Sequence, residues 1–176
     1  MASVVLKAIA NLGKEKHTVG SLNNWSKNMV NMGAKCETDI DNYMIVELGF
    51  NAQGERTCKL LSDVTKKGYL IASVEDYLGQ YENISAFFNG EGDMARIVIQ
   101  GAGTRFECSN VVGSDSATPI KNGMTAYFDP AKKSYVVCNG KSADQAYETA
   151  GNKYVVVDAI GNTLGGQQTI RLEVIA

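Results

Sequence analysis

The chain has 176 residues, of which 44% are hydrophobic and 20% are charged, a composition typical of one soluble globular domain that buries its own core. Its formal net charge of −2 argues against a general affinity for nucleic acid. No apolar run approaches the roughly 18 residues of a membrane span, and the first residues lack the basic-then-apolar pattern of a secretory signal. We therefore expect an intracellular protein that binds neither membranes nor nucleic acid.

The first 22 residues are predicted to form an N-terminal arm or helix, followed by a β-rich core domain at residues 23–176. Four apolar side chains follow the spacing of one face of a short helix, but the two adjacent β-branched residues, Val4 and Val5, suit an extended arm equally well. The four are Val4, Val5, Ile9 and Leu12. Residues 18–22 fit a short strand. Residues 25–32 nearly fit a helix, which asparagines and Gly33 weaken.

Five segments in the middle of the chain have the alternation or the composition of strands: residues 43–48, 57–61, 69–73, 94–100 and 104–108. In the first, the even-numbered residues from Met44 to Phe50 are apolar, which predicts one buried face. Phe106 and Cys108 alternate with Arg105 and Glu107 in the last.

Turns and caps are predicted between these strands. Ser73 precedes two acidic residues and predicts the start of a helix that runs to about residue 81. The glycine-rich residues 101–105 lead into a strand and lack the lysine of a phosphate-binding loop, so we interpret them as a hairpin turn.

The strongest local signal is a β-hairpin at residues 123–138. Asp129 and Pro130 have the turn chemistry of its tip, where Lys132 and Lys133 face water or an acidic partner. Residues 111–118 are predicted to be a polar loop, and Ser142 caps a helical turn to residue 147. Strands at residues 153–158 and 168–175 flank a long glycine-rich turn.

Strands at this spacing predict a mainly β, single-domain antiparallel β-barrel or sandwich with one or two short helices and the N-terminal arm or helix. Several tyrosines fall in the predicted strands, so we expect them to pack in the core or barrel wall: Tyr43, Tyr69, Tyr127, Tyr135 and Tyr154. The four cysteines lack the close spacing of a zinc site and are expected to be reduced. They are Cys36, Cys58, Cys108 and Cys138.

Few residues have the pattern of a catalytic or metal site. His17 is the single histidine, and its charged surroundings predict an exposed side chain rather than a catalytic base. Asp39, Asp41 and Asn42 have the oxygens that a hard cation prefers, but they lack the glycine and the distant glutamate of an EF-hand and fit a solvated lead-in to a strand.

Acidic side chains are the remaining catalytic candidates. Glycosidic bonds are cleaved by a pair of carboxylates, and Glu91, Asp93 and Glu107 are the candidates for such a pair. A chain with 19 acidic residues contains many such pairs by chance. We therefore expect a binding or assembly module without a cofactor or metal, and not an enzyme.

Several stretches resemble small structural proteins of tailed bacteriophages that are encoded near the major capsid protein. They are Gly68-Tyr-Leu-Ile-Ala-Ser-Val-Glu75, Phe87-Phe-Asn-Gly-Glu-Gly-Asp-Met-Ala-Arg96, Arg105-Phe-Glu-Cys-Ser109, the hairpin at 123–137 and Thr169-Ile-Arg-Leu-Glu-Val174. The resemblance implies a head decoration, or cement, protein. Such a protein is made in the host cytoplasm and binds the major capsid protein on the capsid exterior, often as a homotrimer.

On this interpretation, the apolar residues of the N-terminal arm are the candidate anchor to the capsid or to a neighbouring subunit, and Lys132 and Lys133 are further candidate contacts. A tail-tube or head–tail connector subunit is the alternative within virions, with residues 109–118 and 161–166 as inter-subunit loops. Alternatives of another class are a carbohydrate-active β-barrel enzyme that uses Glu91 and Glu107, and a ligand-binding barrel with a lined internal cavity.

Overall fold

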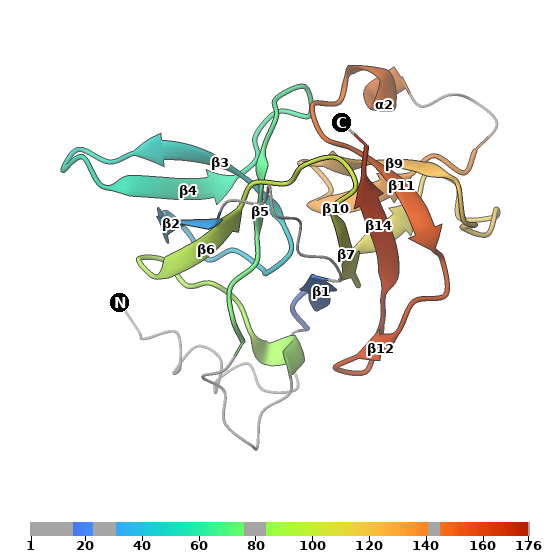
Figure 1. The fold of residues 1–176 in the computed structure, drawn as a ribbon, viewed down its shortest axis with the longest axis horizontal. Helices are drawn as coiled ribbons and strands as arrows, with labels where there is room; N and C mark the ends of the chain where they lie inside the picture. The colour runs from blue at the N-terminus through green and yellow to red at the C-terminus, as the bar shows by residue number, and fades with distance from the viewer. Residues whose placement is uncertain (1–15, 23–30, 76–83, 141–144, 176) are drawn as a thin grey trace.

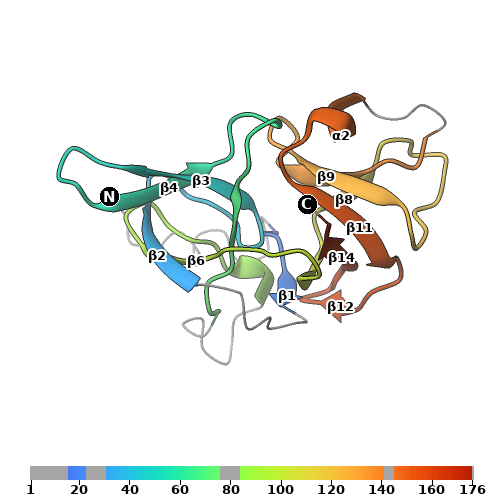
Figure 2. The same ribbon diagram turned by 45° about the horizontal axis from the view of Figure 1, so that its top comes forward.

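The structure is a computed structural model that describes residues 16–22, 31–75, 84–140 and 145–175. These residues form two β-sheet bodies that lie side by side, as Figures 1 and 2 show from two directions. The first body is a closed five-stranded barrel in the order β2-β4-β3-β5-β6. Its strands are β2 (Asn31–Cys36), β3 (Ile45–Phe50), β4 (Arg56–Leu60), β5 (Tyr69–Ile71) and β6 (Met94–Val98).

The second body is a seven-stranded sheet in the order β1-β7-β14-β11-β9-β10-β8. Its strands are β1 (Gly20–Leu22), β7 (Arg105–Cys108), β8 (Val111–Gly113), β9 (Thr125–Asp129), β10 (Ser134–Val137), β11 (Lys153–Asp158) and β14 (Ile170–Val174). Most neighbours are antiparallel, but β8 runs parallel to β10, and in the barrel β2 runs parallel to β4. The mainly β fold predicted from the strand spacing is confirmed.

Small elements complete the described chain. The 3-10 helix η1 (Ile84–Ala86) precedes β6, and the helix α2 (Gln145–Thr149) precedes β11. Strands β12 (Thr163–Leu164) and β13 (Gln167–Gln168) form a separate hairpin below the sheet in Figure 1. Within the described residues, no helix has both the length and the apolar character needed to cross a membrane.

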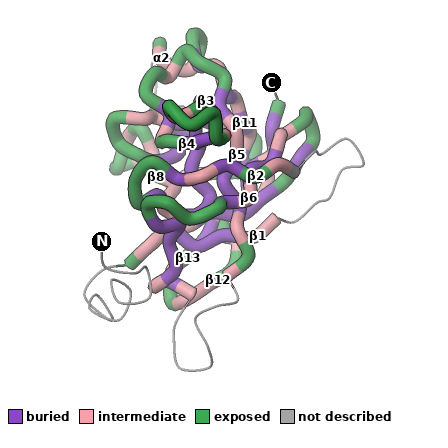
Figure 3. The backbone as a smooth tube through the Cα atoms, turned by 90° about the vertical axis from the view of Figure 1, so that its left-hand side faces the viewer, coloured by how far each residue is buried: buried purple, intermediate pink, exposed green. Residues whose placement is uncertain are grey.

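One hydrophobic core serves both bodies, with Ile45, Leu70 and Ile97 from the barrel and Phe106 and Leu172 from the sheet. Figure 3 shows that the buried residues run through the middle of the molecule, whereas exposed residues lie on its outer loops. Four aromatic rings form the centre of the sheet side, with ring centroids 5.2–5.8 Å apart. They are Phe106, Phe128, Tyr135 and Tyr154. The shared core is consistent with one domain.

The predicted burial of the strand tyrosines is confirmed for Tyr127, Tyr135 and Tyr154, and Tyr69 is half-buried. Tyr43 is also buried, but it stands before β3 with a φ of 60°, which is rare for a residue other than glycine. Its backbone carbonyl accepts a 2.8 Å hydrogen bond from the Tyr135 hydroxyl. The contact joins the barrel to the sheet.

Two further contacts hold the bodies together. The side chain of Asn152, which precedes β11, makes two hydrogen bonds with the backbone of Gly68. Its amide group donates to the Gly68 carbonyl at 3.1 Å, and its amide oxygen accepts from the Gly68 N–H at 2.7 Å. Gly20 in β1 packs so closely that an added Cβ would lie 2.1 Å from the Glu107 carbonyl and 2.7 Å from the Tyr43 ring. A side chain at position 20 would therefore push β1 away from both neighbours.

The predicted hairpin at residues 123–138 is confirmed: β9 and β10 are antiparallel, and the Asp129 carboxylate accepts from the N–H groups of Ala131 and Lys132 at the turn. The predicted hairpin around residues 101–105 is wrong. Strand β6 already pairs with β2 and β5 in the barrel, so the chain crosses to the other sheet and β7 pairs with β1 and β14.

Several smaller predictions need correction. Residues 111–113 form β8 rather than loop, and residues 161–166 include β12. The face predicted from Met44 to Phe50 is buried only near the base of β3, where Ile45 and Val46 are both buried. Phe50 is 67% exposed because β3 and β4 extend beyond the barrel as a projecting ribbon (Figure 1).

Two helix predictions fall partly outside the described residues. Residues 73–75 are not helical, and residues 76–81 lie outside the description. Ser142 also lies outside it, and α2 begins at Gln145.

Candidate functional site

A cleft of about 390 Å³ lies where the barrel and the sheet meet. The loop before β3 contributes acidic and apolar side chains, and the β9–β10 turn contributes a lysine. The lining residues are Thr38, Asp39, Ile40, Asp41, Met44, Leu60, Asn110 and Lys133. The cleft therefore brings together Lys133, a predicted contact residue, and the two aspartates considered as cation ligands.

The two aspartates are occupied by contacts within the protein. Asp39 accepts a 2.8 Å hydrogen bond from the Glu91 N–H, and Asp41 accepts from the N–H and hydroxyl of Thr18. The Asn42 side chain binds the backbone of Ser73 instead. Across the described residues, no group of three or more His, Cys, Asp or Glu side chains is arranged to hold a metal ion. These carboxylates thus brace loops.

His17 is not exposed as predicted, because only 12% of its side chain is accessible. Its Nδ1 atom lies 2.6 Å from an Asp41 carboxylate oxygen, and its ring packs on Phe88 with centroids 4.8 Å apart. Its backbone carbonyl accepts from the Gln167 side chain at 2.8 Å. His17 therefore fixes the chain just before β1 to the barrel and to the β12–β13 hairpin.

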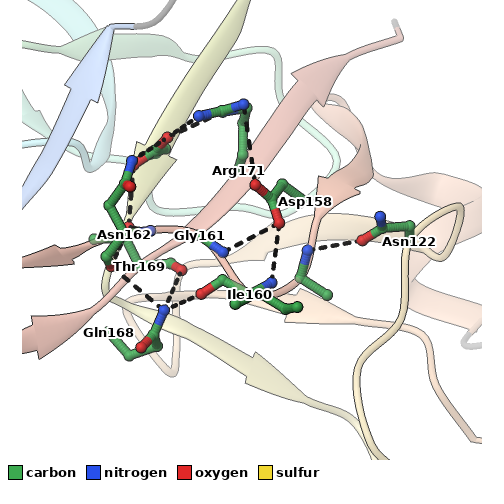
Figure 4. A network of polar contacts seen from close by, with 10 residues as sticks. Asn122, Asp158, Ile160, Gly161, Asn162, Gln168, Thr169 and Arg171 are labelled. Atoms are coloured by element: carbon green, nitrogen blue, oxygen red, sulfur yellow. Dashed lines mark hydrogen bonds and ion pairs between the residues drawn. The ribbon is translucent and has the colours of Figure 1, made fainter.

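A polar network surrounds Glu107 of β7, and Figure 4 shows its members Asn162, Thr169 and Arg171. The Glu107 side chain is only 1% exposed, although in the sequence this residue alternates with the apolar Phe106 and Cys108. Asn162 donates to both carboxylate oxygens, at 2.9 and 3.1 Å. Thr169 and Arg171 donate at 3.1 and 3.0 Å, the latter from Nε.

The network continues outward from Arg171 and explains the charge state of Glu107. Arg171 also approaches Asp158, whose carboxylate accepts from the N–H groups of Ile160 and Gly161. Burial alone raises the pKa of Glu107, but the hydrogen bonds from Asn162, Arg171 and Thr169 outweigh it and lower the net pKa. An ionised, fully bonded carboxylate is a structural anchor for the β12–β13 hairpin.

The carboxylates considered for glycosidic cleavage are divided between the two bodies of the fold. Glu91 and Asp93 are exposed in the turn before β6, which belongs to the barrel, whereas Glu107 is enclosed in the other sheet. Asp93 accepts from the N–H of Gly90, at the other side of its turn. A substrate sugar would have to displace the donors around Glu107 before reaching it.

The predicted contact residues divide into two groups. Val4, Val5, Ile9 and Leu12 lie outside the described residues. Lys132 and Lys133 are exposed at the β9–β10 turn, where Lys132 lies 3.8 Å from the Asp129 carboxylate. Lys133 adopts a φ of 51°, and its carbonyl accepts from the Asn110 side chain. The turn therefore holds both lysines outward beside the cleft.

Sequence reasoning missed the buried asparagines that organise the loops. Asn139 donates to the carbonyl of Asp115 at 2.9 Å and to that of Thr118, and it accepts from the Asp115 N–H. It holds the polar loop after β8 against the end of β10. Asn139 and Asn152 both adjoin a glycine, which in the sequence indicates only a turn.

Comparison with known proteins places these features in a family. The model of the YonC prophage protein family matches residues 13–175. The SPbeta prophage-derived uncharacterized protein YonC of Bacillus subtilis (strain 168) is 44% identical over 181 residues, which cover 99% of each chain. Among solved structures, the head fiber gp8.5 N base in bacteriophage phi29 covers 84% of this chain and 94% of its own, at 11% identity and a TM-score of 0.45. The first two matches confirm the phage origin that the sequence resemblance implied. On their length and identity, the chain belongs to the YonC prophage protein family.

Proposed function

We propose that this protein is a structural component of a phage particle that binds the outside of the capsid as a decoration protein and braces the shell. Its membership of a prophage protein family supports a phage role. One observation carries the proposal: the buried polar side chains described above form hydrogen bonds that join loops and sheets to each other. Such a molecule acts through its shape and its surface and transforms no substrate.

A brace must transmit force without deforming, and the way the two bodies are joined supports this role. The barrel and the sheet share one core and are joined through Tyr135 and Asn152. Glu107 fixes the outer hairpin to the same body. Close packing of this kind makes an interior stiff. Repeated weak contacts of a stiff unit over a lattice sum to firm attachment.

The proposed binding surface is the β9–β10 turn with its neighbouring cleft, assisted by the N-terminal arm. Lys132 and Lys133 give the turn positive charge, and Asp39 and Asp41 give the cleft negative charge. A surface that carries both positive and negative charges binds a complementary protein surface in one defined orientation. The partner is the major capsid protein, and a homotrimer matches the local three-fold axes of a capsid lattice.

Particle composition tests the proposal directly. A prophage that carries this gene is induced, the particles are purified, and the copy number is measured by quantitative mass spectrometry while immunogold labelling locates the protein. We expect a fixed ratio to the major capsid protein and label distributed over the head. Label confined to one vertex or to the tail would indicate a connector or tail subunit instead. Particles without the protein would contradict a virion role.

Two variants then test the binding surface. Deletion of residues 1–13 and the double substitution Lys132→Gln with Lys133→Gln are each expected to give a folded protein with reduced occupancy on particles that lack the wild-type protein. The matched control is Lys66→Gln with Lys67→Gln, a lysine pair in another exposed turn. Normal occupancy by the turn variant, or equal loss in the control, would reject the β9–β10 turn as a contact.

A further inference from the structure

Two cysteines on neighbouring strands lie in contact inside the barrel. The Sγ atoms of Cys36 and Cys58 are 3.7 Å apart, and both residues are almost fully buried. Strands β2 and β4 run parallel here, and the two residues are direct partners in the register. Neither the proposed binding surface nor the polar network uses them. None of the four cysteines is in a disulfide.

The backbone at this position suits a covalent bond. Neighbouring strands lie about 5 Å apart, which is within the Cα separation of roughly 4.4–6.8 Å that disulfides span. Both side chains belong to the same core cluster, so they point to the same side of the strand pair. Closing the sulfurs from 3.7 Å to a bond of about 2 Å needs only small side-chain rotations.

We propose that Cys36 and Cys58 are a disulfide-forming pair that closes across β2 and β4 on exposure to a small oxidant of the peroxide class. Both cysteines are buried, so the oxidant reaches them when the barrel opens locally, and a small peroxide needs a smaller opening than a bulky disulfide reagent. The bond would form after the protein leaves the reducing cytoplasm in which it is made. It concerns the interior of the barrel and is independent of what the protein binds.

The environment of the pair assigns the roles of the two sulfurs. The hydrogen bond with Cys36 lowers the pKa of Cys58 against the opposing effect of burial. The same hydrogen bond, and then burial and the nearby Asp93 and Asp39, raise the pKa of Cys36. Cys58 is therefore the sulfur of the pair that loses its proton more readily, and the deprotonated form of cysteine is the nucleophile.

The reaction balances in two steps. The Cys58 sulfur attacks one oxygen of the peroxide, the O–O bond breaks, and a sulfenic acid forms while the other oxygen leaves as water with the thiol proton. The Cys36 sulfur then attacks the sulfenic sulfur, the S–S bond forms, and the S–O bond breaks with release of a second water. Two thiols are oxidised and one peroxide is reduced to two waters.

The experiment uses the full-length wild-type protein. It is reduced with dithiothreitol, desalted, treated with graded hydrogen peroxide and unfolded in guanidinium with N-ethylmaleimide, so that remaining thiols are counted by intact mass. Trypsin cleaves after Lys35, Arg56 and Lys59. A disulfide between the two cysteines therefore joins the peptide of residues 36–56 to the tripeptide of residues 57–59.

We expect oxidation to remove two of the four thiols and to produce this joined peptide. The urea midpoint of unfolding should rise on the order of 1 M, because the bond restricts the unfolded chain. The variant Cys138→Ala keeps the pair and should behave as the wild type, whereas Cys58→Ala should yield no joined peptide. If Cys58→Ala does not fold, the peptide maps of the wild type and of Cys138→Ala decide the result.

Three results would overturn the proposal. They are four thiols that persist under peroxide, a bond that involves Cys108 or Cys138 instead, and a Cys36–Cys58 bond that lowers the urea midpoint.

Discussion

Replacing Glu107 by glutamine is expected to destabilise the protein by about 3 kcal/mol at neutral pH. The glutamate accepts from Asn162, Thr169 and Arg171, and its side chain is 1% exposed. Hydrogen bonds to a charged group contribute about 1.5–3 kcal/mol each. Glutamine keeps one acceptor oxygen but turns an NH2 group toward donors, so about one such bond is lost and a donor–donor conflict is added.

Breaking a buried ion pair by removing one partner costs about 3–5 kcal/mol. We expect a loss at the lower end of this range, because Arg171 remains partly exposed to water and close to a second carboxylate, that of Asp158. The Arg171 side chain is 32% exposed and lies 4.0 Å from Asp158. The free energy of unfolding is measured by urea titration with far-UV circular dichroism. The control Glu173→Gln removes an ion pair with Arg105 between the same two strands, where the arginine is 52% exposed. This control should lose less than about 1 kcal/mol.

The pH dependence separates the charge of Glu107 from its packing. Its pKa is lower in the folded protein than the ordinary value of 4.5, so its stabilisation is fully present above 4.5 and is lost as the pH falls through the folded value. The difference in stability between the wild type and Glu107→Gln should therefore shrink in acid. A difference below about 0.5 kcal/mol at neutral pH, or one that does not change with pH, would refute this explanation.

Two further predictions concern single contacts. Tyr135→Phe removes the hydroxyl that donates to the Tyr43 carbonyl at 2.8 Å but keeps the ring packing. The free energy of unfolding, measured by urea titration, should therefore fall by about 1–2 kcal/mol. An unchanged urea midpoint would mean that this hydrogen bond does not help to join the barrel to the sheet. Gly161→Ala should cost more than about 2 kcal/mol, because φ is 55° and the added Cβ would lie 1.9 Å from the Thr169 carbonyl oxygen. The control Gly166→Ala, with a φ of 75° and no atom within 4 Å, should cost about 1 kcal/mol, and equal losses in both variants would contradict the steric explanation.

The hairpin of β9 and β10 shows what local chemistry can predict. Asp129 binds the turn backbone, and apolar strand residues flank it on both sides, so all the information lies within about 16 residues of sequence. The paired strands β3 and β4 were predictable for the same reason, because the connection between them is short. In such cases the partner strand is the next one along the chain.

The candidate site depended on contacts that no local pattern contains. His17 meets Asp41 across 24 positions, and Glu107 meets Asn162 and Arg171 across 55 and 64. From the sequence alone, a charged side chain is predicted to be exposed, because burying a charge without a partner is costly. Partners that come from distant strands remove that cost, and they are visible only when the sheet has formed.

By itself, the sequence determined the abundance of strands, the position of the main hairpin and, through its family resemblance, the phage origin. Only the tertiary structure decided that β6 and β7 belong to different bodies and that Cys36 faces Cys58. Strand alternation reports which face is buried, not which neighbour is paired. Pairing depends on which sheet edges remain open after the rest of the chain has folded, and that is a property of the whole molecule.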